Sequence, residues 1–434
     1  MRRLITVVLA LTFMVLTVVG CGNNKNSKTG TGTDFEPKLD KSKSCSIVIY
    51  GSYSNFEALE NEFDRFNEYY PNVELSYQYL DGYGDAIGNS LLSKEAPDIY
   101  CTFYWMWGNP DYQDVFDSAA DLAEENTDID FSSVRDKIIR KTENGQVLMA
   151  PVLATSFGML VNTDLFKKEG VKIPTTWSEF EDACEKLKAA GYASPMMGYV
   201  SSASGSFEYN FGYPALVNAV VSNPSYRDSF NNLEPQAGEV MRSSLEKIKE
   251  LKDSGNIDTM KCQNEIADNY DAAIMRFFEG DVPMLVCSAD VASGTKKRES
   301  QSEKYTSSPF SYEFYPVPFD EEGGFVIDTV SMNFSVNKNS PNKDMAMEFM
   351  RFLISSKELE NMASVKRLIT TSKDLSLDNI YAALGNVPKE RIICSTDANI
   401  NDNAIKQFRY AAHHVLMGDM TVDEAVEMFG KLEE

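Results

Sequence analysis

Aromatic side chains occupy nearly consecutive positions in one short stretch of the sequence. The stretch is Phe103-Tyr104-Trp105-Met106-Trp107, it ends in Gly-Asn-Pro, and it holds two of the three tryptophans of the chain. Aromatic rings can stack on the apolar face of a ligand, so we expect at least one of Tyr104, Trp105 and Trp107 to contact one. Core packing is the alternative, although a core segment would space its aromatic residues periodically.

Covalent catalysis has no comparable signal in the sequence. There is no GxSxG, HExxH, Walker A or complete GxGxxG motif, and Gly82-Tyr83-Gly84 lacks the lysine that a phosphate loop needs. The two histidines, His413 and His414, are adjacent, so on a helix they would point about 100° apart and could not easily share one ligand. We therefore expect no catalytic residue, no metal ion and no cofactor.

Length and composition limit the class of protein. The chain has 434 residues, of which 43% are hydrophobic, and a formal net charge of −24. This length predicts two or more folding units, and so acidic a chain repels phosphates, which argues against a nucleic-acid partner. Six cysteines besides Cys21 show no CxxC spacing, so we expect them to be mostly buried free thiols.

The first residues have the pattern of a secretory signal. A positive start, Met1-Arg2-Arg3, is followed by an apolar run and by Val18-Val19-Gly20-Cys21, which resembles a bacterial lipobox. We expect cleavage after residue 20, lipidation of Cys21 and a flexible tether over residues 21–44, which are rich in Gly, Asn, Ser, Thr and Lys. The body would then be anchored to the membrane on its extracytoplasmic face, on the periplasmic side if the host has an outer membrane. An uncleaved membrane anchor is the alternative.

Elements that alternate between strand and helix follow the tether. The patterns predict strands over 46–50, 73–77 and 97–101 and, between the first two, a helix whose buried face carries Phe56, Leu59, Phe63 and Phe66. A β-α-β order implies a parallel sheet of an α/β protein, in which ligands lie beyond the carboxyl ends of the strands. The loops that we expect near a ligand begin at Gly51, Leu80 and Thr102.

A second segment of the chain carries clear helix signals. Thr176 and Glu179 are spaced as a capping box, in which a hydroxyl and a carboxylate each bind a free amide at the start of a helix. Gly191 follows the apolar face of this helix and predicts a left-handed ending. We expect Trp177, at the start of the helix, to be structural.

This second segment also resembles a known family. The stretch 159–191 is similar to a signature of the bacterial extracellular solute-binding proteins of family 1, the carbohydrate-binding receptors of ABC importers. The family string Y-N-x-D-L-F-x-K-x-G-(x)-x-P-x-T-W-x-E-F corresponds to residues 161–180, with Val161 in place of the tyrosine. Further family-like segments follow in family order at 278–284, 315–318, 337–343 and 418–425.

The resemblance implies the two-lobed, type II periplasmic-binding-protein fold, with a ligand cleft between lobes joined by crossing hinge strands. It places the crossings near 153–156, 286–290 and 325–329. Lobe 1 would comprise 45–153 and 290–326, and lobe 2 would comprise 154–289 and 327–434. The partners it implies are a small solute and the permease subunits of an ABC transporter, and we expect a monomer.

A sugar has apolar C–H faces and a polar rim, so its site needs aromatic rings together with carboxylates or amides. The loops after the first two strands, the aromatic run, the expected crossings and the family's second-lobe region supply such side chains. The candidate ligand contacts are Tyr53, Ser54, Asp81, Tyr104, Trp105, Trp107, Ser156, Glu208, Tyr209, Asp290 and Asp328. Ser288-Ala289 stands where the family often has Gly and Trp, which puts the identity of the ligand in question.

These patterns favour a lipid-anchored receptor that captures a mono- or oligosaccharide by hinge closure and delivers it to an importer. Two alternatives stay open. The same fold could bind a peptide, a polyol or another metabolite, as the missing Gly-Trp element suggests. The second alternative is a surface hydrolase or lyase that acts on glycans. Release of product from a glycan, lost when Glu208 or Asp290 is replaced, would support that alternative.

Overall fold

The computed structural model describes residues 35–203, 205–266 and 270–432, all of which belong to one compact unit. The expected signal peptide at 1–20, the lipidation of Cys21 and the tether up to residue 34 lie outside the described residues. For residues 35–44 the predicted flexible tether is wrong, because this segment packs on the body: the ring of Phe35 meets Phe352 edge to face at 5.2 Å, and the backbone N–H of Lys38 donates to the Glu348 carboxylate at 2.8 Å. Within the described ranges no helix is long and apolar enough to cross a membrane.

The first sheet of the described chain contains the predicted parallel strands. Its strands run in the order β12-β11-β3-β1-β2, and β4 pairs with β11. β1 pairs in parallel with β2 and with β3, which confirms the predicted β-α-β order, whereas β11 is antiparallel to β3 and β4. The strands are β1 Cys45–Gly51, β2 Val73–Tyr79, β3 Ile99–Thr102, β4 Ala150–Thr155, β11 Val326–Val336 and β12 Ile392–Cys394.

The second sheet has the order β6-β7-β5-β8, and its pairing is also mixed. β5 lies between β7 and β8 and is antiparallel to both, while β6 and β7 are parallel. A small hairpin, β9 with β10, stands apart from it. The strands are β5 Phe157–Asn162, β6 Met196–Met197, β7 Met284–Ser288, β8 Tyr312–Tyr315, β9 Pro318–Asp320 and β10 Gly323–Gly324.

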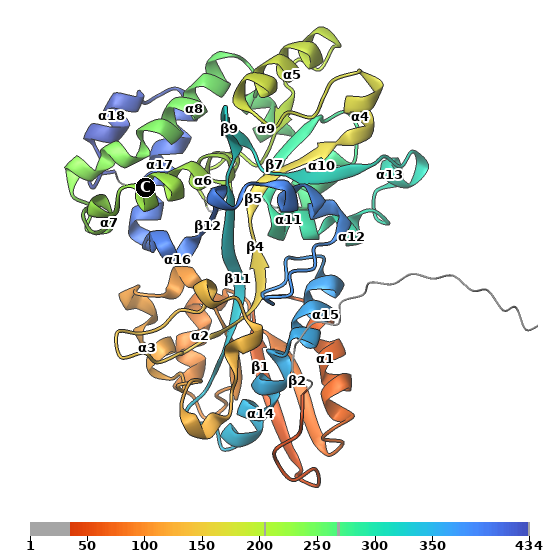
Figure 1. The fold of residues 1–434 in the computed structure, drawn as a ribbon, viewed down its shortest axis with the longest axis vertical. Helices are drawn as coiled ribbons and strands as arrows, with labels where there is room; N and C mark the ends of the chain where they lie inside the picture. Colours follow the sequence, from red (N-terminus) through yellow and green to blue (C-terminus); the bar gives the residue numbers. More distant parts are fainter. Residues whose placement is uncertain (1–34, 204, 267–269, 433–434) are drawn as a thin grey trace, which may run out of the picture. The chain divides into compact units, whose positions relative to one another are not determined.

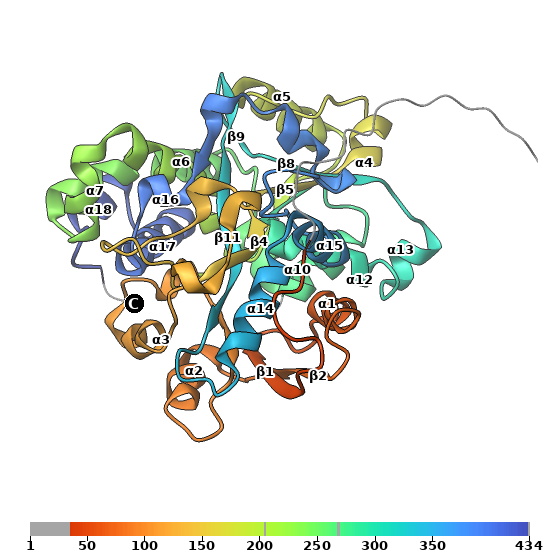
Figure 2. The same cartoon turned by 60° about the horizontal axis from the view of Figure 1, so that its bottom comes forward.

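Helices bury apolar faces against both sheets. Beside the first sheet, α1, α14 and α15 contact one another (Figures 1 and 2). The rings of Phe66 on α1 and Phe349 on α14 meet edge to face at 5.1 Å. Against the second sheet, α6 contacts the strands β5 and β7. The helices are α1 Glu57–Asn67, α2 Tyr83–Leu91, α3 Gln113–Asp117, α4 Thr163–Lys168, α5 Trp177–Ala189, α6 Phe207–Ser222, α7 Pro224–Asn231, α8 Arg242–Asp253, α9 Thr259–Glu265, α10 Tyr270–Phe277, α11 Ala289–Ser293, α12 Thr295–Arg298, α13 Glu303–Ser307, α14 Lys343–Leu353, α15 Ser356–Lys366, α16 Ser395–Ala398, α17 Asp402–Met417 and α18 Val422–Glu427.

Helix α5 begins and ends as predicted, except for half of its cap. The hydroxyl of Thr176 accepts from the backbone N–H of Glu179 at 3.4 Å, and Gly191 has a φ of +104° just beyond the helix. The second predicted bond of the capping box, from the backbone N–H of Thr176 to the carboxylate of Glu179, is wrong. The Glu179 carboxylate accepts instead from the backbone N–H and the hydroxyl of Thr175, one residue earlier, at 2.9 and 2.8 Å. A long glutamate side chain can reach either amide, and spacing alone does not choose between them.

The predicted division into lobes fails after residue 289. The chain does not change sheets near 286–290, because β7 and β8 both pair with β5. Consequently β8, assigned to lobe 1, belongs to the second sheet. The β11 strand and α14, assigned almost entirely to lobe 2, lie with the first sheet. The crossing near 153–156 agrees with the structure, since β4 pairs in the first sheet and β5 in the second.

The six described cysteines are all free, as expected, and five of them are buried. Burial raises the pKa of the Cys184 and Cys287 thiols to about 12. These thiols are therefore protonated and act as small apolar side chains in the core.

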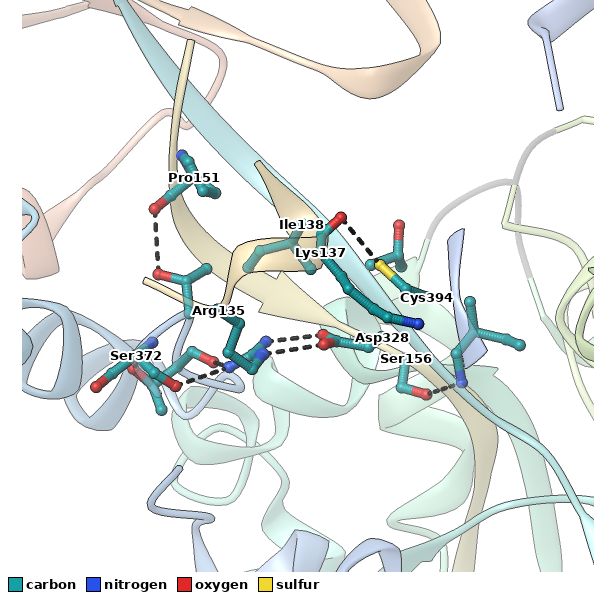
Figure 3. Close-up of polar contacts among 12 residues, drawn as sticks. Arg135, Lys137, Ile138, Pro151, Ser156, Asp328, Ser372 and Cys394 are labelled. Atoms are coloured by element: carbon teal, nitrogen blue, oxygen red, sulfur yellow. Dashed lines mark hydrogen bonds and ion pairs between the residues drawn. The ribbon is translucent and has the colours of Figure 1, made fainter. Parts of the chain in front are cut away.

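Arg135 ties together the segments that cross between the sheets (Figure 3). Its guanidinium donates to both carboxylate oxygens of Asp328 on β11, at 2.9 and 2.7 Å, and to the carbonyls of Thr370 and Ser372. At the same crossing, the hydroxyl of Ser156 accepts from the backbone N–H of Ile327 at 3.2 Å. Asp328 and Ser156 thus make structural contacts where the strands cross.

We expect Arg135→Met to lower the free energy of unfolding by about 2–3 kcal/mol, because it leaves a largely buried carboxylate without its partner. The matched control is Lys137→Met on the same segment. Lys137 pairs with Asp397 in a more exposed position, and such pairs contribute about 0–1 kcal/mol. Denaturant unfolding of both variants measures the difference. Equal losses in the two variants would contradict a special role for Arg135.

Candidate functional site

A cavity of about 610 Å³ lies where residues of both sheets meet. On one side are loops after β1 and β3, the parallel strands whose carboxyl ends were expected to face a ligand. On the other are β5, α6 and the residues after β7. The main lining residues are Ser52, Tyr53, Tyr83, Phe103, Trp105, Phe157, Tyr209, Asn210, Ser288, Asp290, Ser331 and Lys366.

Trp105 supplies a flat aromatic surface to this cavity. Its ring stacks on Phe103 with the centroids 5.7 Å apart and 13° between the planes, and it meets Tyr112 edge to face at 5.0 Å. Gly84 lies so close that a Cβ there would be 3.3 Å from the indole. Neighbours thus fix the ring while 40% of the residue is exposed, which suits stacking against a ligand.

Phe157 and Tyr209 also line this cavity, and Tyr213 packs against both of them. Phe157, at the start of β5, meets Tyr209 at 5.5 Å and Tyr213 at 5.0 Å, and the two tyrosines are 4.7 Å apart. Burial raises the pKa of Tyr213 to about 12 and holds that of Tyr209 well above its usual value, so both phenols keep their protons. A neighbouring cavity of about 220 Å³, lined by Tyr104, Tyr209 and Tyr213 among others, shares Trp105 and Asp290 with the first and extends it.

Asp290 is a half-buried acid that lines the cavity. Its carboxylate accepts from the hydroxyl of Ser331 on β11, and its backbone N–H donates to the hydroxyl of Thr155 on β4 at 3.2 Å. Burial raises the pKa of Asp290, although the two hydroxyls and the charge of Lys366 partly oppose this. The carboxylate is held in place by neighbours and can accept hydrogen bonds from a ligand hydroxyl.

Lys366 and Tyr53 lie at one end of the cavity. The ammonium of Lys366 is 3.9 Å from the ring centroid of Tyr53, a cation–π contact. Burial lowers the pKa of Lys366 and, together with the charge of Asp290, raises that of Tyr53. A second cavity, of about 500 Å³, continues from here and includes Ser54.

The structure brings together six of the eleven predicted contacts in these adjoining cavities. They are Tyr53, Ser54, Tyr104, Trp105, Tyr209 and Asp290. Among the described residues no group of three or more His, Cys, Asp or Glu side chains is placed to hold a metal ion.

The other five predicted contacts lie elsewhere. Ser156 and Asp328 are occupied at the strand crossing, as described above. Glu208 is fully buried, with its carboxylate 2.6 Å from Nδ1 of His413, because α6 turns it away from Tyr209. Trp107 packs edge to face on Phe116 at 5.2 Å, and Asp81 is exposed and bonded to the hydroxyl of Tyr79.

Ser331, Lys366 and Phe157 contact the cavity but were not predicted. Ser331 is one of five polar residues in β11, so the sequence of that strand does not single it out. Lys366 is the last residue of α15, and nothing in its local sequence distinguishes it from a solvent-exposed lysine.

We expect Asp290→Asn to melt at a higher temperature than the unchanged protein at neutral pH. An acid whose pKa is raised by folding favours the folded state most when it is protonated, and this contribution is lost as the pH rises through the raised pKa. The amide removes that loss, so the difference in melting temperature disappears below the ordinary carboxyl pKa. Thermal melts across this pH range test it, and a lower melting temperature at neutral pH would contradict the direction of the shift.

Comparison with known proteins places the chain in a family. A family model described as bacterial extracellular solute-binding protein matches residues 50–360, whereas no curated protein matches in sequence. Among solved structures, RafE in complex with raffinose has a TM-score of 0.67 at 16% identity, covering 89% of this chain and 99% of that one.

Two further structures agree in fold. A sugar transporter from Bacillus licheniformis in complex with stachyose has a TM-score of 0.64 at 16% identity, covering 90% of this chain and 100% of that one. The GacH receptor of Streptomyces glaucescens, also studied with acarbose, has a TM-score of 0.65 at 19% identity, covering 89% and 97%. With the type II fold shared and the family model spanning most of its length, the chain belongs to the bacterial extracellular solute-binding proteins, a family that binds solutes and does not catalyse reactions.

Proposed function

We propose that this protein captures a carbohydrate in the cavities around Trp105 and delivers it to an ABC importer. The observation that carries the proposal is Trp105, a residue that is 40% exposed while its ring is packed on its neighbours, and that lines the same cavity as the carboxylate of Asp290. An aromatic face for the C–H side of a sugar and a carboxylate for its hydroxyls are the two components that such a site requires.

The placement of the lining residues supports capture by closure. Tyr53 and Trp105 follow strands of the first sheet, whereas Phe157, Tyr209 and Asp290 belong to elements of the second. A solute held between them contacts both sets at once. Because a ligand shifts a conformational equilibrium only through contacts that are better in one state, such a solute would stabilise the closed arrangement of the two lobes.

The size of the cavity and the relatives support a saccharide. About 610 Å³ falls within the range of about 300–1,000 Å³ that is usual for small-molecule sites, and two adjoining cavities share its lining residues. Solved structures of the same fold include complexes with raffinose and stachyose and a chitin oligosaccharide binding protein. Lipidation of Cys21 would hold the protein outside the cell beside its permease.

We expect Trp105→Ala to weaken binding of the sugar by about 1–3 kcal/mol, the range measured for stacking on aromatic side chains elsewhere, with little change in melting temperature. The matched control is Trp107→Ala, which removes the same side chain two residues away, outside the cavities. It should lower the melting temperature and leave the affinity unchanged.

Calorimetry of the mature protein against mono- and oligosaccharides, followed by both variants with any sugar that binds, makes the measurement. If only peptides or polyols bind, the carbohydrate assignment is wrong but the family remains. If Trp107→Ala weakens binding and Trp105→Ala does not, the proposed site is wrong.

A further inference from the structure

The second cavity, beyond Tyr53, collects positive charge on a strongly acidic protein. The charged side chains along it are one acid, Glu57, and four cations, Lys296, Lys297, Arg298 and Lys366. In the whole chain, 65 acidic residues outnumber 41 basic ones. The local excess of cations is therefore the reverse of the overall composition.

Two of these cations already have partners. Arg298 forms an ion pair with Asp271 on α10. The ammonium of Lys296 donates to the backbone carbonyls of Ser364 and Val365 at 3.4 and 2.9 Å, so it closes the end of α15. Their charges are at least partly satisfied within the protein.

Lys366 differs from these two. Among the described residues no carboxylate lies at ion-pair distance from its ammonium, whose close contact is the ring of Tyr53 at 3.9 Å. The charged groups that act on it are Asp290, which attracts, and Arg298 and Lys297, which repel. Asp290 is itself bonded to Ser331 and Thr155. Lys366 is thus a half-buried cation that faces two cavities and lacks a matched anion.

A buried charge without a partner is costly, and an anion brought by the ligand would offset that cost. The first and second cavities are continuous at this point, because both are lined by Tyr53, Ser293, Gly294, Arg298 and Lys366. One extended solute can therefore place uncharged rings beside Trp105 and a charged group beside Lys366.

Building on the proposed function, we propose that the solute is an acidic saccharide whose carboxylate or sulfate group binds to Lys366. Lys297, which is exposed at the second cavity, strengthens the attraction, and Glu57 is the one acid that opposes it there. A lysine ammonium attracts a carboxylate and a sulfate alike, as a point charge. The experiment below therefore distinguishes the two anions.

The test uses calorimetry on the mature protein with matched probes. Oligogalacturonate, oligomannuronate and a sulfated chondroitin disaccharide are the acidic probes, and raffinose, xylotriose and chitotriose are the neutral ones. The variants are Lys366→Met, which keeps the apolar stem, Lys366→Arg, which keeps the charge, and Lys338→Met, which removes an exposed charge outside these cavities. Melting temperatures check that each variant folds.

We expect at least one acidic probe to bind more tightly than the neutral probes. Lys366→Met should then weaken its binding about tenfold or more, since a hydrogen bond to a charged group contributes at least that much. Lys366→Arg should retain most of the affinity, Lys338→Met should change nothing, and added salt should weaken the acidic probe alone. Comparing the affinity for the two uronates with that for the sulfated disaccharide shows whether the bound anion is a carboxylate or a sulfate.

The remaining outcomes separate this inference from the proposed function. If neutral saccharides bind as well as or better than every acidic probe, the inference is wrong and carbohydrate capture stands. If an acidic probe binds best but Lys366→Met leaves its affinity unchanged, the assignment of the anion to Lys366 is wrong. If no saccharide of either kind binds, the proposed function fails and the inference fails with it.

Discussion

One half-buried residue that follows β7 of the second sheet, Asp290, is bonded to two strands of the first sheet at the cavity. Asp290 follows β7, and its contacts come from Thr155 at the end of β4 and Ser331 in β11. At the crossing, where β4 and β11 pair, the Ser331 hydroxyl donates to the carboxylate and the Thr155 hydroxyl accepts from the backbone N–H of Asp290. Because β11 also pairs with β3, the strand that leads to Trp105, the strand that bonds Asp290 through Ser331 borders the one that positions the indole.

The Arg135 contacts serve this arrangement from the other side of the crossing. By bonding Asp328 and the carbonyls near residue 370, Arg135 fixes β11 relative to the chain that leads away from α15. Lys366 is the last residue of that helix. Only a few residues of backbone separate Lys366 from the carbonyls of Thr370 and Ser372 that Arg135 bonds. The contacts that support the crossing therefore also help to place the ammonium of Lys366 at the cavity.

The sequence predicted the local features of the fold well. Strands at 46–50 and 73–77, the helix between them and the start of α5 correspond to observed elements, because apolar periodicity and caps are local properties. The crossing at 286–290 was wrong, since whether a strand stays in its sheet is decided by its partners. In the aromatic run, consecutive residues fall into different environments. Trp105 faces the cavity and Trp107 packs on Phe116, and only the turn at Tyr104–Met106 separates these outcomes. Lys366 and Ser331 could not be found at all, because three-dimensional proximity is their only distinguishing property.

The free cysteines have a consequence for how this chain matures. Five of the six described thiols are enclosed in the core, where their protonated state makes them poor nucleophiles. During export the unfolded chain would present all of them to an oxidising medium before any core exists. Correct maturation then requires that folding be faster than oxidation of the thiols. Otherwise the sulfur atoms form disulfide bonds that the native packing does not accommodate.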